Sequence, residues 1–294
     1  MKMQITSIFI PMAMALCVHQ TATAQTFHSA PVNIPGGSNI LVTGINDNQE
    51  MVVNYTDSAG TAHCLSIMGK TAKPIADLNE MGTGPGKGTS CWGINNSGQI
   101  VGSYSTGLFG NGFVYTAGTY TDIIVPGATA GTTPYGLNNV GQIVGSFADN
   151  AGQHGFLFTV STGTYQTLDV PTAFATLAIG INDAGVITFE WVSPGFIYSG
   201  AVFYNGKYIT LNVPGALQSK ARGINNFGSI VVNAEDTAGV WHGYVFKGGK
   251  FTRFDVGNAA NTYSFGINSQ DVLVGGFNPA SSPASEVGFY GRIF

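Results

Sequence analysis

The sequence predicts an all-β protein: a six-bladed β-propeller of four-stranded antiparallel blades, with the ring closed by an N-terminal strand that completes the last blade. Three observations predict this fold: the composition, a motif that occurs six times, and the way the repeat is cut at its ends. The 294 residues include 42 glycines and 12% aromatic side chains, but only 9% are charged. Many glycines among Phe, Tyr, Val and Ile favour short strands joined by tight turns.

The motif is GIN or GLN, and it divides the chain into units of 43 to 49 residues. It begins at Gly44, Gly93, Gly136, Gly180, Gly223 and Gly266. After the motif comes an apolar pair, such as Ile100-Val101, and later a strand start, such as Gly112-Phe113. Each unit thus contains four apolar runs, strands A to D, separated by turn residues. Four strands at a period of about 40 residues are typical of a propeller blade.

The two ends of the chain predict how the ring closes. The last unit ends at GFYGRIF (residues 288–294), after strand C, and lacks a strand D. The segment PVNIPGGSNILVTGIN (residues 31–46) matches the end of strand D and the start of the next unit. We therefore expect residues 31–34 to lie beside the last strand, because closing the ring removes exposed sheet edges.

Two strand starts carry a family resemblance. HGFLF (residues 154–158) and HGYVF (residues 242–246) each follow a GIN-type motif and an Ile-Val pair. Over most of residues 31–294 the chain resembles the HAF-type extracellular repeat of bacteria, which is named for a His-Ala-Phe strand start. Here Gly replaces the Ala, and the His becomes Asn111 in unit two and Ser199 in unit four. The resemblance implies secretion and a propeller-like fold, and it supplies no catalytic residues.

Polar residues that recur in the repeat are expected to serve the fold. An Asn side chain in every motif should bond the backbone of its turn; these residues are Asn46, Asn95, Asn138, Asn182, Asn225 and Asn268. Units one, three and five each place an Asp ahead of a His, in the pairs Asp57–His63, Asp149–His154 and Asp236–His242. We expect an Asp–His hydrogen bond that holds the loop between strands B and C. A shared metal site is disfavoured, because zinc requires ligands within about 2.1 Å and alternate units lie too far apart.

Residues 1–24 are predicted to be a secretory signal, with Lys2, an apolar core and Ala22-Thr23-Ala24 before the cleavage point. Residues 25–294 then form one domain, exported to the periplasm, the cell surface or the medium. No later segment is long and apolar enough to span a membrane. Cys64 and Cys91 remain after cleavage, and in an oxidising compartment they could pair as a disulfide or stay free.

The net charge limits the classes of partner that the sequence predicts. A formal net charge of −4 provides no broad attraction to nucleic acid or to anionic membranes, so the sequence predicts neither as a partner. We expect a monomer, and we expect no cofactor.

Binding is expected on one face of the ring. The D–A and B–C loops vary between units and should emerge on the same face. On the innermost strands near that face stand four aromatic and two basic residues: Trp92, Tyr135, Lys220, Arg222, Tyr263 and Phe265. Aromatic surfaces beside cationic donors suit sugar rings or peptide segments. The alternative is that these side chains fill space between units.

Glu190 is unusual for its repeat position, ten residues after the glycine of its motif. The other units have Asn54, Ser103, Ser146, Asn233 and Gly276 there. Glu190, Asn54 and Asn233 together are a candidate calcium site, because calcium prefers oxygen ligands. Glu190 is also the candidate catalytic residue, as a general acid, but no second carboxylate stands in register with it.

These features predict a secreted recognition or scaffold module that binds an extracellular glycan or an exported protein, and disfavour an enzyme. The first alternative is a polysaccharide hydrolase or lyase, assisted by calcium through Glu190. The second is a structural cell-surface repeat protein.

Overall fold

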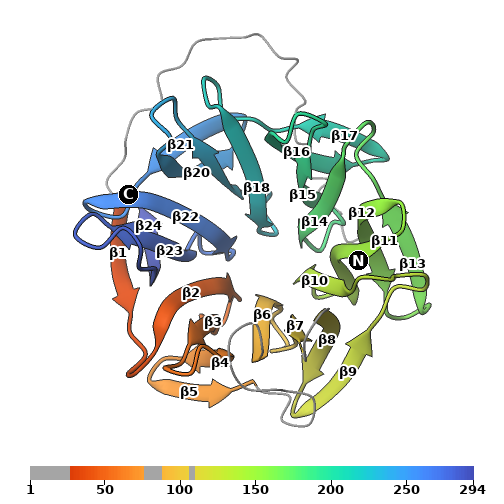
Figure 1. Cartoon of the computed structure of the whole chain (residues 1–294), viewed down its shortest axis with the longest axis horizontal. Coiled ribbons are helices and arrows are strands. Elements are labelled where there is room, and N and C mark those ends of the chain that lie inside the picture. Colours follow the sequence, from red (N-terminus) through yellow and green to blue (C-terminus); the bar gives the residue numbers. More distant parts are fainter. Residues whose placement is uncertain (1–26, 76–87, 106–109) are drawn as a thin grey trace, which may run out of the picture.

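The computed structural model describes residues 27–75, 88–105 and 110–294. All regular elements of these residues are β-strands, and they are arranged in a ring around a central axis (Figure 1). The predicted secretory signal, residues 1–24, lies outside the described residues. Within the described part of the chain, no helix has the length and hydropathy of a membrane span.

The strands follow the repeat that the sequence predicts. Unit one contains β2 (Ser38–Ile45), β3 (Met51–Thr56), β4 (Ala62–Met68) and β5 (Thr71–Pro74). Unit two contains β6 (Gly88–Ile94), β7 (Ile100–Ser105), β8 (Gly110–Thr116) and β9 (Thr119–Ile123). Unit three contains β10 (Thr132–Leu137), β11 (Gln142–Asp149), β12 (Gly152–Thr159) and β13 (Thr164–Leu168).

The second half of the chain continues the pattern. Unit four contains β14 (Ala175–Ile181), β15 (Ile187–Val192), β16 (Tyr198–Tyr204) and β17 (Lys207–Thr210). Unit five contains β18 (Gln218–Ile224), β19 (Ile230–Glu235), β20 (Trp241–Lys247) and β21 (Lys250–Phe254). Unit six contains β22 (Ala259–Ile267), β23 (Leu273–Pro279), β24 (Val287–Ile293) and, from the other end of the chain, β1 (Phe27–Val32).

The sequence predicted a four-stranded sheet for each unit, and this prediction is correct for only some of the units. Among the described strands, units five and six form sheets of four strands, whereas units one and two, and units three and four, form sheets of eight. In each larger sheet a single parallel pair joins the two units, Ala62 with Gly88 and Gln153 with Ala175. Gly88 allows this contact, because a Cβ at this residue would lie 2.0 Å from the carbonyl oxygen of Ala62.

The N-terminal strand pairs with the last strand, as predicted, but it lies earlier in the chain. β1 is antiparallel to β24, with Phe27 opposite Ile293 and Val32 opposite Gly288. In Figure 1 this strand lies beside the C-terminal strands. The predicted residues 31–34 contribute only partly, because the chain turns immediately after β1: Gly37 N–H donates to the Ile34 carbonyl at 2.9 Å, and Gly36 has a positive φ of 75°.

The hydrophobic core lies between neighbouring units. Six clusters of buried side chains each combine residues of two adjacent units. One of them joins the last unit to the first through Val274, Val42 and Val53. Because each sheet buries both of its faces against its neighbours, the units stabilise one another around the ring.

The recurring Asn residues link the units on the side of the A–B turns. As predicted, Asn46 Oδ1 accepts hydrogen bonds from backbone N–H groups in its own turn, at 3.0 Å from both Asn48 and Glu50. The sequence did not indicate a second role. Each Asn amide also donates to the backbone carbonyl of the same Asn in the next unit, and Asn268 donates to Asn46, so these six bonds form a closed circuit.

The predicted Asp–His hydrogen bonds are confirmed in units one and five. His63 Nε2 lies 2.9 Å from Asp57 Oδ2, and His242 Nε2 lies 3.1 Å from Asp236 Oδ2. In unit three, His154 Nε2 lies 3.3 Å from Asp149 as an ion pair without hydrogen-bond geometry. A second carboxylate, on the strand D side, also contacts the ring Nδ1 of His242 and of His154. These partners are Asp255 at 2.8 Å and Asp169 at 2.9 Å.

Candidate functional site

The six inner strands surround a cavity of about 370 Å³ on the ring axis. Four of the six residues predicted to bind ligand line this cavity, together with Glu190. The four are Trp92, Tyr135, Arg222 and Phe265. The remaining two, Lys220 and Tyr263, stand at a neighbouring position of the same strands but are not part of the wall.

The motif glycines explain why these side chains meet. A Cβ at Gly93 would lie 2.7 Å from the Tyr135 carbonyl oxygen, and a Cβ at Gly223 would lie 2.7 Å from that of Phe265. Only glycine therefore lets adjacent inner strands approach so closely. The residue before each glycine consequently stands near its counterparts from other units, and its side chain sets the chemistry of the cavity wall.

A charged cluster forms at the junction between units four and five. Glu190, on β15, is 4% exposed. Its Oε2 lies 2.9 Å from Arg222 Nη2, and its Oε1 lies 3.3 Å from Lys220 Nζ. Both cations come from β18 of the next unit, and their side chains are about one-fifth exposed (21% and 20%). A buried carboxylate requires such partners, so the two cations account for Glu190 at this repeat position.

Arg222 presents its guanidinium to the cavity. The guanidinium carbon lies 5.7 Å from the centre of the Phe265 ring, within range of a cation–π contact. Its Nε is buried and has no hydrogen-bond partner among the described residues. A buried donor without an acceptor is unfavourable, so the guanidinium is held at this position chiefly by its ion pair with Glu190.

Lys220 lies outside the cavity wall, between two aromatic rings that the sequence analysis did not single out. Its Nζ is 3.8 Å from the centre of the Tyr198 ring and 5.1 Å from that of Trp241. Burial lowers the pKa of Lys220, and Glu190 opposes this shift by favouring the charged form. Trp241 stands directly before the strand-start His of its unit, a position that gave no indication of this contact.

Two aromatic rings form the opposite part of the wall. The rings of Trp92 and Tyr135 meet edge to face, with centroids 5.7 Å apart. Trp92 Nε1 donates to Ser103 Oγ at 3.4 Å. Burial raises the pKa of the Tyr135 phenol, although hydrogen bonds to Ser146 and Thr133 partly oppose the shift. Both rings are therefore held in place by their own units.

Tyr263, like Lys220, lies outside the cavity wall and close to Trp241. Its ring centre is 6.0 Å from that of Trp241, and it does not line the cavity. Burial raises its pKa, and the nearby carboxylates of Glu286 and Glu235 raise it further. The predicted ligand-binding set is thus divided into an inner part on the cavity wall and an outer part beside Trp241.

The candidate calcium ligands are not brought together. Asn54 bonds the backbone of Cys91 at the junction of units one and two, with Nδ2 donating at 2.8 Å and Oδ1 accepting at 2.9 Å. Asn233 bonds Ser264 in the same way at the junction of units five and six. Glu190 lies at a third junction, paired with two cations. A single calcium ion could not reach all three, and in the described ranges no cluster of three or more His, Cys, Asp or Glu residues could hold a metal.

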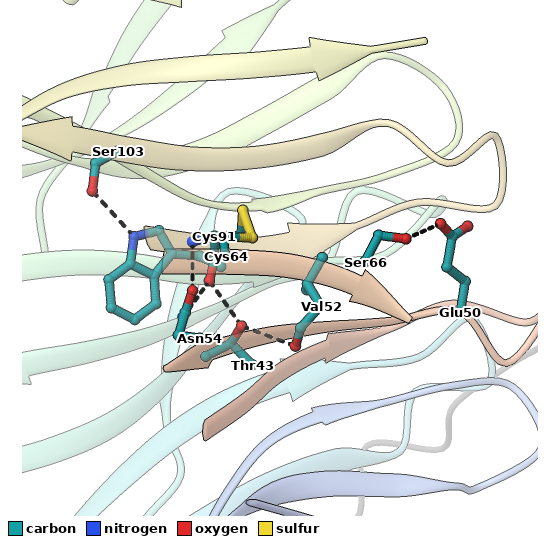
Figure 2. The surroundings of a disulfide bond; sticks show 9 residues. Thr43, Glu50, Val52, Asn54, Cys64, Ser66, Cys91 and Ser103 are labelled. Carbon is teal, nitrogen blue, oxygen red and sulfur yellow. Dashed lines mark hydrogen bonds between the residues drawn. A yellow bond between two sulfur atoms is a disulfide. The ribbon is translucent and has the colours of Figure 1, made fainter. Parts of the chain in front are cut away.

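The two cysteines form a disulfide, one of the two states that the sequence left open. Cys64 of β4 and Cys91 of β6 are joined, with a Cα–Cα distance of 5.8 Å. Figure 2 shows this bond beside the Asn54 side chain and Thr43, whose hydroxyl donates to the Cys91 carbonyl at 2.8 Å. This junction is therefore held by a covalent bond and by hydrogen bonds.

No protein-family model and no curated protein sequence matches the chain. Its fold is similar to that of several solved β-propellers. A TolB from Acinetobacter baumannii superposes with a TM-score of 0.56 at 10% identity, over 87% of this chain and 65% of that protein. The fucose-binding lectin of Aleuria aurantia, a six-bladed β-propeller, gives a TM-score of 0.51 at 12% identity over 86% and 91%.

The lectin SapL1, solved with alpha methyl fucoside, gives a TM-score of 0.53 at 10% identity over 82% of this chain and 88% of the lectin. At such identities the likeness establishes the propeller fold. Several solved structures of similar fold are thus lectins that bind fucose.

Proposed function

We propose that the protein is an exported six-bladed β-propeller of four-stranded blades, which recognises an extracellular glycan in its axial cavity. The observation that carries this proposal is the Glu190–Arg222 pair on the cavity wall, because it places a buried acceptor and a buried donor beside aromatic rings. The relationship to HAF-type repeats and the export to the periplasm or beyond are part of the same proposal. The predicted leader supports the export, and the lectins of similar fold are consistent with glycan recognition.

The chemistry of the wall suits a sugar ring. Small-ligand sites are typically of about 300–1,000 Å³, mostly apolar, with a few polar groups that fix orientation; this cavity, at about 370 Å³, lies within that range. Trp92, Tyr135 and Phe265 supply apolar ring surface. Glu190 can accept hydrogen bonds from hydroxyls and Arg222 can donate to them, without requiring a net charge on the ligand.

An enzyme is the less favoured function. Glycoside hydrolysis generally uses two carboxyl groups on either side of the scissile bond. Among the described residues that line the cavity, Glu190 is the single carboxylate. Both of its oxygens already contact cations, which suits a fixed acceptor better than a proton donor.

The first test is co-sedimentation of the purified protein with a panel of insoluble and gelled polysaccharides, with each supernatant assayed for released sugar. We expect retention without release. Release of sugar would favour the hydrolase or lyase alternative. Absence of both would contradict the glycan proposal and favour an exported protein partner or a structural role.

The second test assigns the binding to the cavity. Trp92→Ala combined with Tyr135→Ala should abolish retention, and Arg222→Gln should weaken it by roughly 10-fold or more, because a hydrogen bond to a charged group contributes about 1.5–3 kcal/mol. Arg253→Gln is the matched control. Arg253 is also ion-paired, with Asp255 at 2.8 Å, but stands on the outer strand β21. Equal losses in the Arg222 and Arg253 variants would contradict the placement of the site.

A further inference from the structure

Two exposed phenylalanines lie next to each other on the face where the D–A and B–C loops emerge. Phe174, in the D–A loop before β14, is 60% exposed, and Phe196, in the B–C loop after β15, is 69% exposed. Their ring centres are 5.2 Å apart, with an edge-to-face angle of 62°. Ile197, next in the chain, is also exposed. Large apolar side chains grouped at the surface indicate an interaction site more often than single ones do.

Hydrogen bonds fix the backbone that carries both rings. Phe174 N–H donates to the Val192 carbonyl at 2.7 Å. In the other loop, Phe196 N–H donates to the Ser193 carbonyl at 2.9 Å, and Ser193 N–H donates to the Ile197 carbonyl at 3.0 Å. The backbone of both turns is therefore fixed, so little backbone entropy would be lost on binding.

Phe196 adopts a conformation that a bulky residue rarely takes. Its φ is +60°, in the left-handed region that Gly or Asn adopts more easily. Strain of this kind persists where the surrounding structure imposes it, and it is concentrated at functional sites. The stability of the turn does not explain why a Phe, rather than Gly or Asn, occupies this position, so we look for its role in binding.

The same strands connect this pair to the axial cavity. Leu177 of β14 and Glu190 of β15 are paired, and both line the cavity. Phe174 precedes Leu177 by three residues, which corresponds to about 10 Å along an extended strand. A ligand that leaves the cavity along unit four would therefore meet the pair within a short distance.

We propose that Phe174 and Phe196 form an outer subsite that stacks a second sugar ring of the glycan bound in the cavity, so that the ligand is an oligosaccharide chain. This inference rests on the proposed function, because it extends the same site. The continuity with the cavity favours a chain over a separate protein partner. Phe174 and Phe196 also supply large, exposed apolar surfaces, on which the apolar face of a sugar ring can pack.

The test is a titration of affinity against chain length. The probes are alpha methyl fucoside and Fucα1-6GlcNAc, together with cello-, chito- and xylo-oligosaccharides of one to six units. For the wild type we expect affinity to rise with chain length. In the Phe174→Ala/Phe196→Asn variant we expect a loss of roughly 3- to 10-fold for the longer chains, the size of one stacking contact, and no change for single sugars.

Three single variants keep the interpretation clear. Phe227→Ala is the matched control, because Phe227 is 70% exposed but lies in the A–B turn of unit five, at the opposite end of the strands. Asn tolerates positive φ, so Phe196→Asn should not lower the melting temperature. Arg222→Gln should weaken all chain lengths alike.

The outcomes separate the two proposals. Binding that is independent of chain length, or a chain-length gain that survives in the Phe174/Phe196 variant, would overturn the outer subsite and leave the cavity site in place. Failure of the wild type to bind any of these probes or any of the retained polysaccharides would overturn both.

Discussion

Two junctions between neighbouring units use the same repeat position in opposite ways. At the junction of units one and two, Asn54 bonds both backbone groups of Cys91, and the disulfide adds a covalent link. At the junction of units four and five the corresponding residue is Glu190, whose carboxylate holds Arg222 and Lys220 instead. The first arrangement uses the position to join units, and the second uses it to place charges on the cavity wall.

The difference follows from hydrogen-bond chemistry. An amide can donate and accept at once, so Asn can satisfy a backbone N–H and a carbonyl together. An ionised carboxylate only accepts. At the second junction the Thr188 hydroxyl donates to the Arg222 carbonyl, and Glu190 contacts the side chains of Arg222 and Lys220. A residue that departs from the repeat is therefore most informative about a site when its side chain also differs in which hydrogen bonds it can donate or accept.

The largest expected effect concerns the first junction. Replacing both cysteines, Cys64→Ala with Cys91→Ala, should lower the free energy of unfolding by about 3.5 kcal/mol, because the bond closes a loop with a sequence separation of 27. Glycan retention should not change. Denaturant unfolding with and without reductant measures the loss. A loss of retention in a folded variant would contradict the division between the two junctions.

Glu190→Gln tests the second junction. It leaves Arg222 and Lys220 without their counter-charge, so we expect a loss of roughly 2–3 kcal/mol in unfolding free energy. Retention should fall by at least about 10-fold. Glu235→Gln is a suitable control, since Glu235 stands on the neighbouring strand β19 and bonds Gln218. Retention that survives in Glu190→Gln would remove the charged pair from the site.

Asn54→Ala should have a smaller effect. It leaves the buried N–H and carbonyl of Cys91 without the amide, at a cost of about 1–2 kcal/mol, while the disulfide still joins the units. Asn233→Ala should cost a similar or larger amount, because Asn233 makes the same two backbone bonds to Ser264 and also accepts a hydrogen bond from its hydroxyl. Chemical denaturation of both variants checks this expectation. A change in glycan retention would show that the amide positions belong to the site.

The smallest expected effect is a pH dependence of stability that arises from His154, which belongs to neither of these two junctions. Burial alone would lower the pKa of His154, but the hydrogen bond and charge of Asp169, together with Asp149, outweigh it and raise the pKa above its usual value. The stabilisation is therefore fully present below about pH 6.5, the usual pKa of His. It is lost as the pH rises through the raised value.

Solvent screening keeps this contribution small. Comparing the unfolding of the wild type and His154→Gln from pH 5 to pH 9 should show the difference shrinking with pH. A difference that grows with pH would contradict the assignment.

The ring could be predicted from the sequence because its determinants are repeated. Gly93 and its counterparts occur in every unit and are required wherever inner strands approach closely. Asn46 and its counterparts bond the turn within each unit. The extent of β1 was not predicted, because the match to strand D begins at Pro31, whereas the strand begins at Phe27 and ends at Val32.

The site was predicted in part, for the opposite reason. Trp92 and Arg222 were found because they vary where the repeat is otherwise regular. The role of Glu190 depends on side chains of the next unit, and the spacing within one unit carries no information on that contact. Trp241 and Tyr198 were missed because aromatic residues are common at strand starts and are usually explained by packing.

The most direct measurement is retention on one glycan-bearing matrix, compared side by side for the wild type, Cys64→Ala/Cys91→Ala and Glu190→Gln. We expect the wild type and the disulfide-free variant to be retained and Glu190→Gln to remain in the supernatant. Retention of Glu190→Gln together with loss of the disulfide-free variant, both folded, would contradict the assignment of structure to one junction and recognition to the other.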